Sequence, residues 1–253
     1  MTTILVYPWT LQQYGVGAEI ERLRKKGIDS VALAAHYHSI RTFAPRAESE
    51  KFVQYPGGCY FTPEPTDFVS TSIEPLTNEI PGLTEPVSTV REATADRNLD
   101  LAAWMVCLHN TRLGAEHPEF RLQGVFGEAH DHSLCPSYPA VQEYYAGVAR
   151  SLCRCEVDRI DLESLGFPSV LHGHGVDFGH SKNHVLTSDS EEFLLSQCFC
   201  DGCRRRAEAT DIDMDAAESL IQELLEDSIR GPQDHPPKLV TLVEEYPVLE
   251  DLF

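Results

Sequence analysis

Four apolar, β-rich stretches separated by segments with helical spacing constrain the fold of this chain more than any other feature. The first stretch, "TILVYPWT", is followed by "GAEIERLRKKGIDS", which has helical periodicity, basic residues in its last turn and Gly27 as a stop signal. The second stretch is "DSVALAAHYHS". Strand, helix and strand at this spacing form a βαβ unit, so the first two strands are predicted to be parallel and adjacent.

The same alternation continues toward the middle of the chain. A helix near residues 84–97 precedes "LDLAAWMVCLHN", and the helical segment "YPAVQEYYAGVARSLCRCE" precedes "VDRIDLESLGF". Long polar loops follow the second, third and fourth strands, and the segments after residue 190 have helical patterns only. The pattern predicts one α/β domain over residues 1–253, with about four parallel strands and crossover helices in 1–190 and a helical C-terminal region in 190–253.

Charge and cysteine content narrow the functional classes. The chain has 40 acidic against 20 basic residues and a formal net charge of −20, which disfavours binding to nucleic acid or an anionic membrane. Few of the basic residues are lysine, a bias typical of a halophilic surface. The sequence lacks a signal peptide and an apolar run long enough to span a membrane, which predicts a cytoplasmic protein whose eight cysteines are thiols or metal ligands.

Each predicted strand becomes polar or aromatic at its C-terminal end. In parallel α/β folds ligands bind at this rim, because the following loops and helix N-termini converge there. Side chains two residues apart on a strand share a face, so His36 and His38 are expected on one face, and Asp161 and Glu163 likewise. Glu163 precedes a glycine-containing loop, which is a common position for a catalytic carboxylate.

Several motifs occur in a recognisable order: "AAWMVCLHNTRLG", "HPEF", "FGEAHDHSLCPSYPAVQEYY", "VDRIDLESLGF", "HGH" and "CFCDGCRRRA". In this order the chain resembles the poorly characterised glycosyl-hydrolase-like TIM-barrel proteins. The resemblance implies a (β/α)₈-type fold and a carbohydrate-related activity. Eight strands usually need about 250 residues, whereas only four are predicted here, so we expect a partial barrel. Such a chain is either a fragment or completes its sheet in a homodimer.

The resemblance implies a glycoside hydrolase-like protein that needs no cofactor. Glu163 is the predicted acid/base or nucleophile, with Asp161 in support, and the second carboxylate of such enzymes would often come from a later strand. Aromatic rings suit the apolar faces of sugars, and Arg112 can clamp the carboxylate of an acidic sugar. The predicted substrate-binding residues are Tyr7, Trp9, His36, His38, His109, Asn110, Arg112, His172 and His174.

Two other functions fit the same residues. A metal-dependent hydrolase would use the "HYH" and "HGH" histidines together with the two strand-end acids. Its predicted ligands are His36, His38, His172, His174, Asp161 and Glu163. The third hypothesis is a truncated, non-catalytic remnant of a barrel enzyme or a dimerising half-barrel.

The motif "CFCDGC" places Cys198, Cys200 and Cys203 within a short segment. Three thiolates at this spacing can hold a structural Zn²⁺ if a fourth ligand comes from elsewhere in the chain. The nearest candidates in the sequence are His180, His184, Cys153 and Cys155. The alternative is that reduced cysteines pack at a helix N-terminus as small apolar residues.

Overall fold

The structure is a computed structural model that describes residues 1–45, 50–170, 188–210, 212–230 and 238–250. These residues form two compact units, and each unit is discontinuous in sequence. Unit 1 consists of Met1–Leu113 and Pro139–Leu165, and unit 2 of Gly114–Tyr138 and Gly166–Phe253. The division therefore differs from the predicted boundary at residue 190, because residues 114–138 belong with the C-terminal helices.

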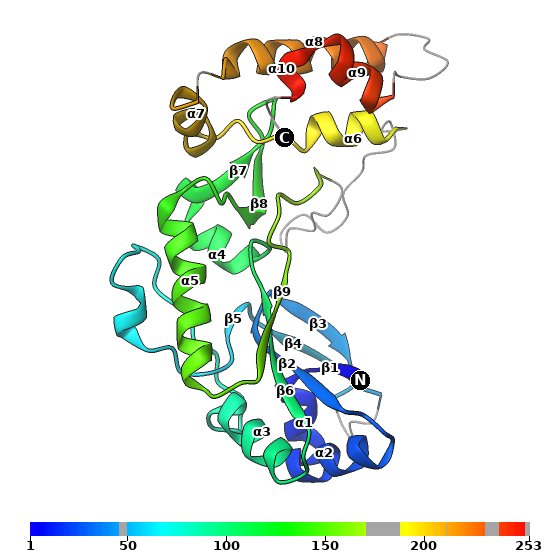
Figure 1. The fold of residues 1–253 in the computed structure, drawn as a ribbon, viewed down its shortest axis with the longest axis vertical. Helices are drawn as coiled ribbons and strands as arrows, with labels where there is room; N and C mark the ends of the chain where they lie inside the picture. The colour runs from blue at the N-terminus through cyan, green and yellow to red at the C-terminus, as the bar shows by residue number, and fades with distance from the viewer. Residues whose placement is uncertain (46–49, 171–187, 211, 231–237, 251–253) are drawn as a thin grey trace. The chain divides into compact units, whose positions relative to one another are not determined.

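Unit 1 is built on a parallel sheet with the strand order β1-β2-β6-β9 (Figure 1). These strands are Thr3–Val6, Ser30–Tyr37, Asp100–Val106 and Arg159–Glu163. The connecting helices are α1 (Pro8–Tyr14), α2 (Val16–Lys25), α3 (Pro86–Ala95) and α5 (Pro139–Arg154). Each strand lies within a predicted stretch, and sequential parallel strands with crossover helices are the arrangement of a partial (β/α)₈ barrel.

The burial of each strand follows its place in the sheet. All residues of β2 are buried, as expected for a central parallel strand covered on both faces, whereas β1 and β9 are the outer strands and are more exposed. The guanidinium of Arg159 on β9 donates to the hydroxyl of Thr3 on β1 over 3.4 Å. Because side chains of the two outer strands meet across the sheet, the sheet is curled as in a barrel.

One face of this sheet carries aromatic side chains, and we call it the aromatic face. The small residues Ala32 and Ala34 on β2 and Ala102 on β6 leave room for large rings to pack over them. Trp104 comes from β6, whereas Trp9 comes from α1. The buried cluster consists of Trp9, Ala32, Ala34, Tyr37, Tyr60, Ile80, Leu83, Ala102, Trp104 and Val106.

The long loop predicted after β2 contains short elements of its own. They are β3 (Ile40–Phe43), β4 (Phe52–Tyr55), β5 (Gly58–Cys59) and the 3₁₀ helix η1 (Pro65–Phe68). Strands β3 and β4 form an antiparallel hairpin, and β5 pairs with β2 in the antiparallel direction. The η1 segment is fixed to α5 because Arg154 and Ser151 donate to the carboxylate of Asp67.

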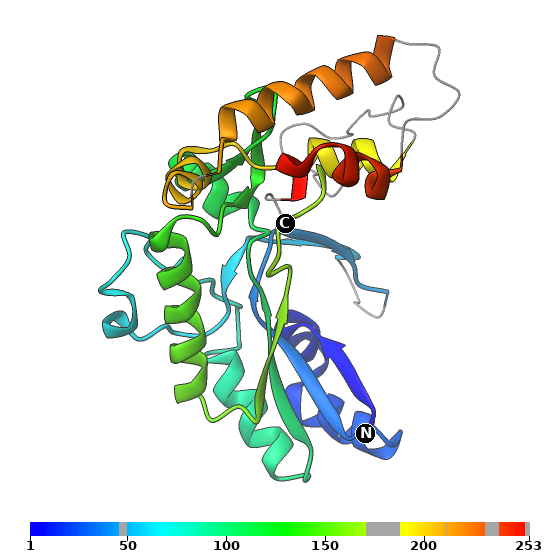
Figure 2. The same cartoon turned by 45° about the horizontal axis from the view of Figure 1, so that its top comes forward.

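Unit 2 combines a β-hairpin with helices (Figure 2). Its elements are η2 (Pro118–Phe120), β7 (Arg121–Gln123), β8 (Ala129–Leu134), α6 (Asp189–Leu195), α7 (Asp201–Glu208), α8 (Met214–Arg230), α9 (Leu239–Glu245) and α10 (Pro247–Glu250). Helix α4 (Thr111–Glu116) leads into this unit. The helical C-terminal region is therefore confirmed, and in the part of the chain that the structure describes no helix has the length and hydropathy to cross a membrane.

The hairpin and the helices of unit 2 share one hydrophobic core. Val125 of the hairpin turn packs with Phe199 and with the apolar residues of α8, such as Ile221 and Leu225. The side chain of Gln222 also donates to the carbonyl oxygen of Val125 over 2.7 Å. Residues 114–138 thus belong structurally to the C-terminal helices from which they are distant in sequence.

Candidate functional site

The C-terminal ends of the unit 1 strands carry the predicted catalytic carboxylate. Glu163 ends β9 with an exposed side chain, and the indole Nε1 of Trp104 donates to its Oε2 over 2.5 Å. Asp161 pairs in register with Trp104, and Glu163 with Val106, so both acids lie on one face of β9. Asp161 accepts two hydrogen bonds from Arg159, of 2.7 and 3.1 Å, and is therefore engaged in an ion pair.

A continuous set of rings leads away from Glu163 along the strand ends. Trp104 contacts Tyr37 edge-on at 4.8 Å between centroids, and Tyr37 stacks on His38 at 4.3 Å. His38 in turn stacks on His109 at 4.8 Å. The hydroxyl oxygens of Tyr7 and Tyr37 are 3.2 Å apart, and burial together with this hydrogen bond raises the pKa of Tyr37, which stays protonated at neutral pH.

His36 lies within β2, whereas His38 follows the end of that strand. The pairing of β2 with β6 shifts by one residue between Ala34 and His36, and this bulge lets Tyr37 join Ala34 in the cluster on the aromatic face. His36 is fully buried, with Nδ1 2.7 Å from the Val106 carbonyl oxygen and Nε2 3.1 Å from the Tyr144 hydroxyl on α5. Both ring nitrogens thus face groups of the protein interior, and a role of His36 in binding substrate or metal stays a prediction from the sequence.

Three other predicted binding residues have structural partners. Asn110 is fully buried and caps α4, because its Oδ1 accepts from the backbone N–H of Leu113 over 3.1 Å. Arg112 donates to the carbonyl oxygen of Gly57 and to Asn78, and so fixes the long loop. Trp9 is buried and stacks on Tyr55 with centroids 4.1 Å apart, which is a packing role.

The histidine and carboxylate set of the metal-dependent hydrolase hypothesis is not assembled in the described residues. His172 and His174 lie outside them, and both ring nitrogens of His36 are within hydrogen-bonding distance of other groups. In the described ranges the group of side chains placed to hold a metal ion consists of cysteines instead.

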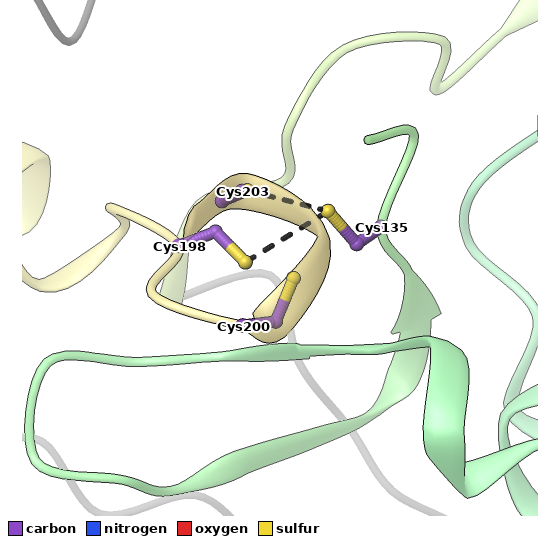
Figure 3. A group of neighbouring side chains, drawn as sticks. All are labelled: Cys135, Cys198, Cys200 and Cys203. Atoms are coloured by element: carbon purple, nitrogen blue, oxygen red, sulfur yellow. Dashed lines mark hydrogen bonds between the residues drawn. The ribbon is translucent and has the colours of Figure 1, made fainter. Parts of the chain in front are cut away.

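That group brings together Cys135, Cys198, Cys200 and Cys203 of unit 2 (Figure 3). The four sulfur atoms lie within 4.8 Å of one another. Cys135 follows the end of β8, Cys198 and Cys200 lie between α6 and α7, and Cys203 is in the first turn of α7. The Sγ atom of Cys135 is 3.5 Å from that of Cys203 and 3.9 Å from that of Cys198.

Polar groups from the backbone and from Ser137 surround these sulfur atoms. The backbone N–H of Ser137 donates to Cys135 Sγ over 3.4 Å, and its hydroxyl lies 3.3 Å from Cys203 Sγ. Hydrogen bonds with the other three cysteines lower the pKa of Cys200 and raise that of Cys198.

Cys135 is the member of this group that the sequence prediction missed. Of the candidate fourth ligands, Cys153 and Cys155 belong to unit 1, and His180 and His184 lie outside the described residues. Cys135 is 63 residues from Cys198, so no local spacing motif includes it. The available signal was the "CP" that precedes α5, which indicates a cysteine at the end of a strand but no partner.

The hairpin also carries a pair of buried histidines that the prediction did not include. His130 and His132 lie two residues apart on β8, and their rings stack with centroids 5.8 Å apart. Neither ring nitrogen of His130 has a hydrogen-bond partner in the described part of the chain. Burial lowers the pKa of His130, so the imidazole is neutral.

Comparison with known proteins gives neither a family nor a close relative. No protein-family model and no curated protein matches the chain. Among solved structures, α-L-fucosidase isoenzyme 2 from Paenibacillus thiaminolyticus aligns with 94% of this chain and 32% of its own, at 14% identity and a TM-score of 0.49.

Two further structures give weaker overlaps. A noncanonic maltogenic α-amylase, AmyB, from Thermotoga neapolitana aligns with 66% of this chain and 40% of its own, at 14% identity and a TM-score of 0.41. A hypothetical protein from Ruminiclostridium thermocellum aligns with 65% of this chain and 77% of its own, at 14% identity and a TM-score of 0.43. The chain thus spans less than half of the two named enzymes, and overlaps with TM-scores this low determine neither its family nor its activity.

Proposed function

We propose that unit 1 binds a carbohydrate at the C-terminal ends of its parallel strands, with Glu163 as the acid/base group. The observation that carries this proposal is the hydrogen bond from Trp104 Nε1 to the exposed carboxylate of Glu163. This bond orients one carboxylate oxygen and leaves the other available to a ligand. The position agrees with the general rule that ligands of parallel α/β folds bind at this edge.

The groups next to Glu163 suit a polyhydroxylated ligand. The paired hydroxyls of Tyr7 and Tyr37 and the stacked imidazoles of His38 and His109 can donate to and accept from sugar hydroxyls. Tyr7, His38 and His109 are half-buried at this edge of the sheet. The rings also offer the flat apolar surface on which sugar C–H faces pack.

Hydrolysis of a glycoside would require a second carboxylate. Asp161 is on the same strand as Glu163 and is held by Arg159 in a two-bond ion pair, so it is a poor candidate for this role. We therefore assign Glu163 to carbohydrate binding and proton transfer.

The two tryptophans allow a direct binding test. Trp9 and Trp104 are the tryptophans of the chain and both belong to the aromatic face, so intrinsic fluorescence reports on this site. Titration with a panel of neutral and acidic oligosaccharides is expected to give a saturable change. Glu163→Gln should weaken binding about 10- to 100-fold, which corresponds to the loss of one charged hydrogen bond.

The matched control is Glu156→Gln, an exposed glutamate near the opposite, N-terminal end of β9. This variant is expected to bind like the wild type. If a glycoside is turned over, Glu163→Gln should lower kcat about 10²- to 10⁴-fold, the usual contribution of one acid/base group. Equal affinity and equal turnover of the Glu163→Gln variant and the wild type would contradict the proposal.

A further inference from the structure

We propose that Cys135, Cys198, Cys200 and Cys203 bind one Zn²⁺ ion that joins the two sequence segments of unit 2. The spacing of the sulfur atoms supports this site. A tetrahedral ion with Zn–S distances of about 2.3 Å separates its sulfur ligands by about 3.8 Å. The Sγ atom of Cys135 lies 3.5 Å from that of Cys203 and 3.9 Å from that of Cys198, on either side of this value, and all four sulfur atoms fall within 4.8 Å of one another.

Disulfide bonds do not account for the grouping of the four cysteines. A disulfide holds its sulfur atoms about 2.0 Å apart, whereas these cysteines are all free. Thiols that merely fill a core pack against apolar side chains, because sulfur is a weak hydrogen-bonding group. Here the four thiols lie against one another (Figure 3). Two of them, Cys135 and Cys203, are also hydrogen-bonding partners of Ser137.

Hydrogen-bond donors surround the sulfur atoms. Metal-bound thiolates usually accept hydrogen bonds from nearby backbone and side-chain donors, which fix the ligand geometry. The N–H of Ser137 points at Cys135, and Cys200 and Cys203 stand at the N-terminus of α7, where the helix dipole favours negative charge. Gly202 allows the Tyr138 ring to pack closely against this turn, because an added Cβ would lie 3.0 Å from the ring.

The ligand set identifies the metal and its role. Four thiolates select a soft, tetrahedral ion, and Zn²⁺ is the common occupant of such sites. With four protein ligands no coordination position is left for water or substrate, so the site is structural. The zinc proposal is independent of the carbohydrate proposal, since the cysteines are all in unit 2.

The four cysteines come from two separate segments of the chain, so the ion would link these segments. Cys135 lies near the end of the first segment of unit 2, residues 114–138. Residues 139–165 then belong to unit 1, and the second segment of unit 2 begins at residue 166. The other three ligands lie in this second segment, and Phe199 between them is buried in the unit 2 core and donates its N–H to the Gln123 carbonyl oxygen over 2.7 Å. The ion therefore closes a long loop, and metal binding is coupled to the folding of unit 2.

The test measures metal content and ligand type on the full-length, untagged protein purified with a reductant. We expect about one equivalent of zinc per chain by elemental analysis. Replacement with Co²⁺ should give the intense sulfur-to-cobalt charge-transfer band and the visible bands of a tetrahedral thiolate site. Removal of zinc with a chelator should lower the thermal stability, and added Zn²⁺ should restore it.

Two variants and one control separate ligation from packing. Cys135→Ser should lose the zinc and lower the thermal stability, whereas Cys135→His, which keeps a ligand atom, should retain most of the zinc. Cys153→Ser replaces an exposed cysteine of unit 1 and should bind zinc like the wild type. The proposal would be overturned if the folded wild-type protein contained no zinc and bound neither added Zn²⁺ nor added Co²⁺. Tightly bound iron in place of zinc would overturn the identity of the metal.

Discussion

His36 shows at the level of one residue how burial sets protonation. The imidazole is fully buried between β6 and α5, and desolvation lowers its pKa from 6.5 to about 4. It is therefore neutral in the folded protein at pH 7, with Nδ1 as the donor to the Val106 carbonyl oxygen. In the unfolded chain the same side chain takes up a proton near pH 6.5.

This difference predicts an acid-sensitive stability. Because the unfolded state binds more protons between pH 6.5 and about 4, the free energy of unfolding should fall as the pH falls through that window. The contribution of His36 at pH 4 is a loss of about 3 kcal/mol relative to pH 7. His36→Asn keeps a donor for Val106 but cannot titrate, so urea unfolding at several pH values should show a flatter dependence for this variant.

Glu163 could be identified as a site residue from the sequence, whereas Cys135 could not. Glu163 was singled out by its place at a strand end, and the structure adds Trp104 as the group that orients it. Cys135 has no such local signal, and only the fold brings it to the other three thiols. For a ligand set drawn from distant segments, residue type is read from the sequence but proximity is not.

At the scale of elements, the contact between α5 and η1 fixes the long loop of unit 1. Arg150 of α5 donates to the backbone carbonyl oxygen of Asp67, and Arg154 and Ser151 bind its carboxylate. Gly147 lies on the same helix at the point of closest approach, because a Cβ there would be 2.7 Å from the Asp67 oxygen and 3.0 Å from the Phe68 ring. The glycine thus lets η1 approach the helix backbone.

This packing predicts opposite outcomes for two helical glycines. Alanine is a better helix former than glycine by about 1 kcal/mol, yet Gly147→Ala should destabilise the protein by about 1–3 kcal/mol through overpacking. Gly17→Ala on α2 is the matched control, since its nearest neighbour is 3.7 Å away at Arg97 and no clash results. Chemical denaturation of both variants measures the difference, and equal stabilisation by the two substitutions would contradict the assigned contact.

At the scale of the whole molecule, the large excess of acidic residues affects the stability of the folded protein. A formal net charge of −20 produces repulsion between surface carboxylates in the folded state. Ion pairs such as Arg91 with Asp158, at 2.5 Å, and Arg121 with Asp131, at 2.6 Å, offset this repulsion locally. Screening by dissolved salt lowers the remaining repulsion over the whole surface.

We therefore expect the thermal stability to rise with salt. The screening length falls from about 8 Å at physiological ionic strength to about 3 Å at 1 M, so Tm should increase over this range in NaCl or KCl. Chloride salts are preferred because sulfate also strengthens hydrophobic burial in any protein. A Tm that is constant or falls with added NaCl would contradict the halophilic prediction.

The sequence by itself determined the four parallel strands, their order through crossover helices and the position of Glu163 at a strand end. These features depend on local periodicity and on the chirality of βαβ connections, which adjacent residues encode. The homodimer and the cytoplasmic location remain predictions from the sequence. The helical C-terminal region was also correct, because its amphipathic spacing is local.

Only the tertiary structure decided which side chains meet. Packing buried His36 against Val106 and Tyr144, and hydrogen bonds engaged Asn110 in capping and Arg112 in a loop contact. The return of the chain to unit 2 placed Cys135 beside the "CFCDGC" cysteines. The physical reason is that periodicity fixes the face of an element over a few residues, whereas register shifts and long-range contacts are settled by packing over the whole fold.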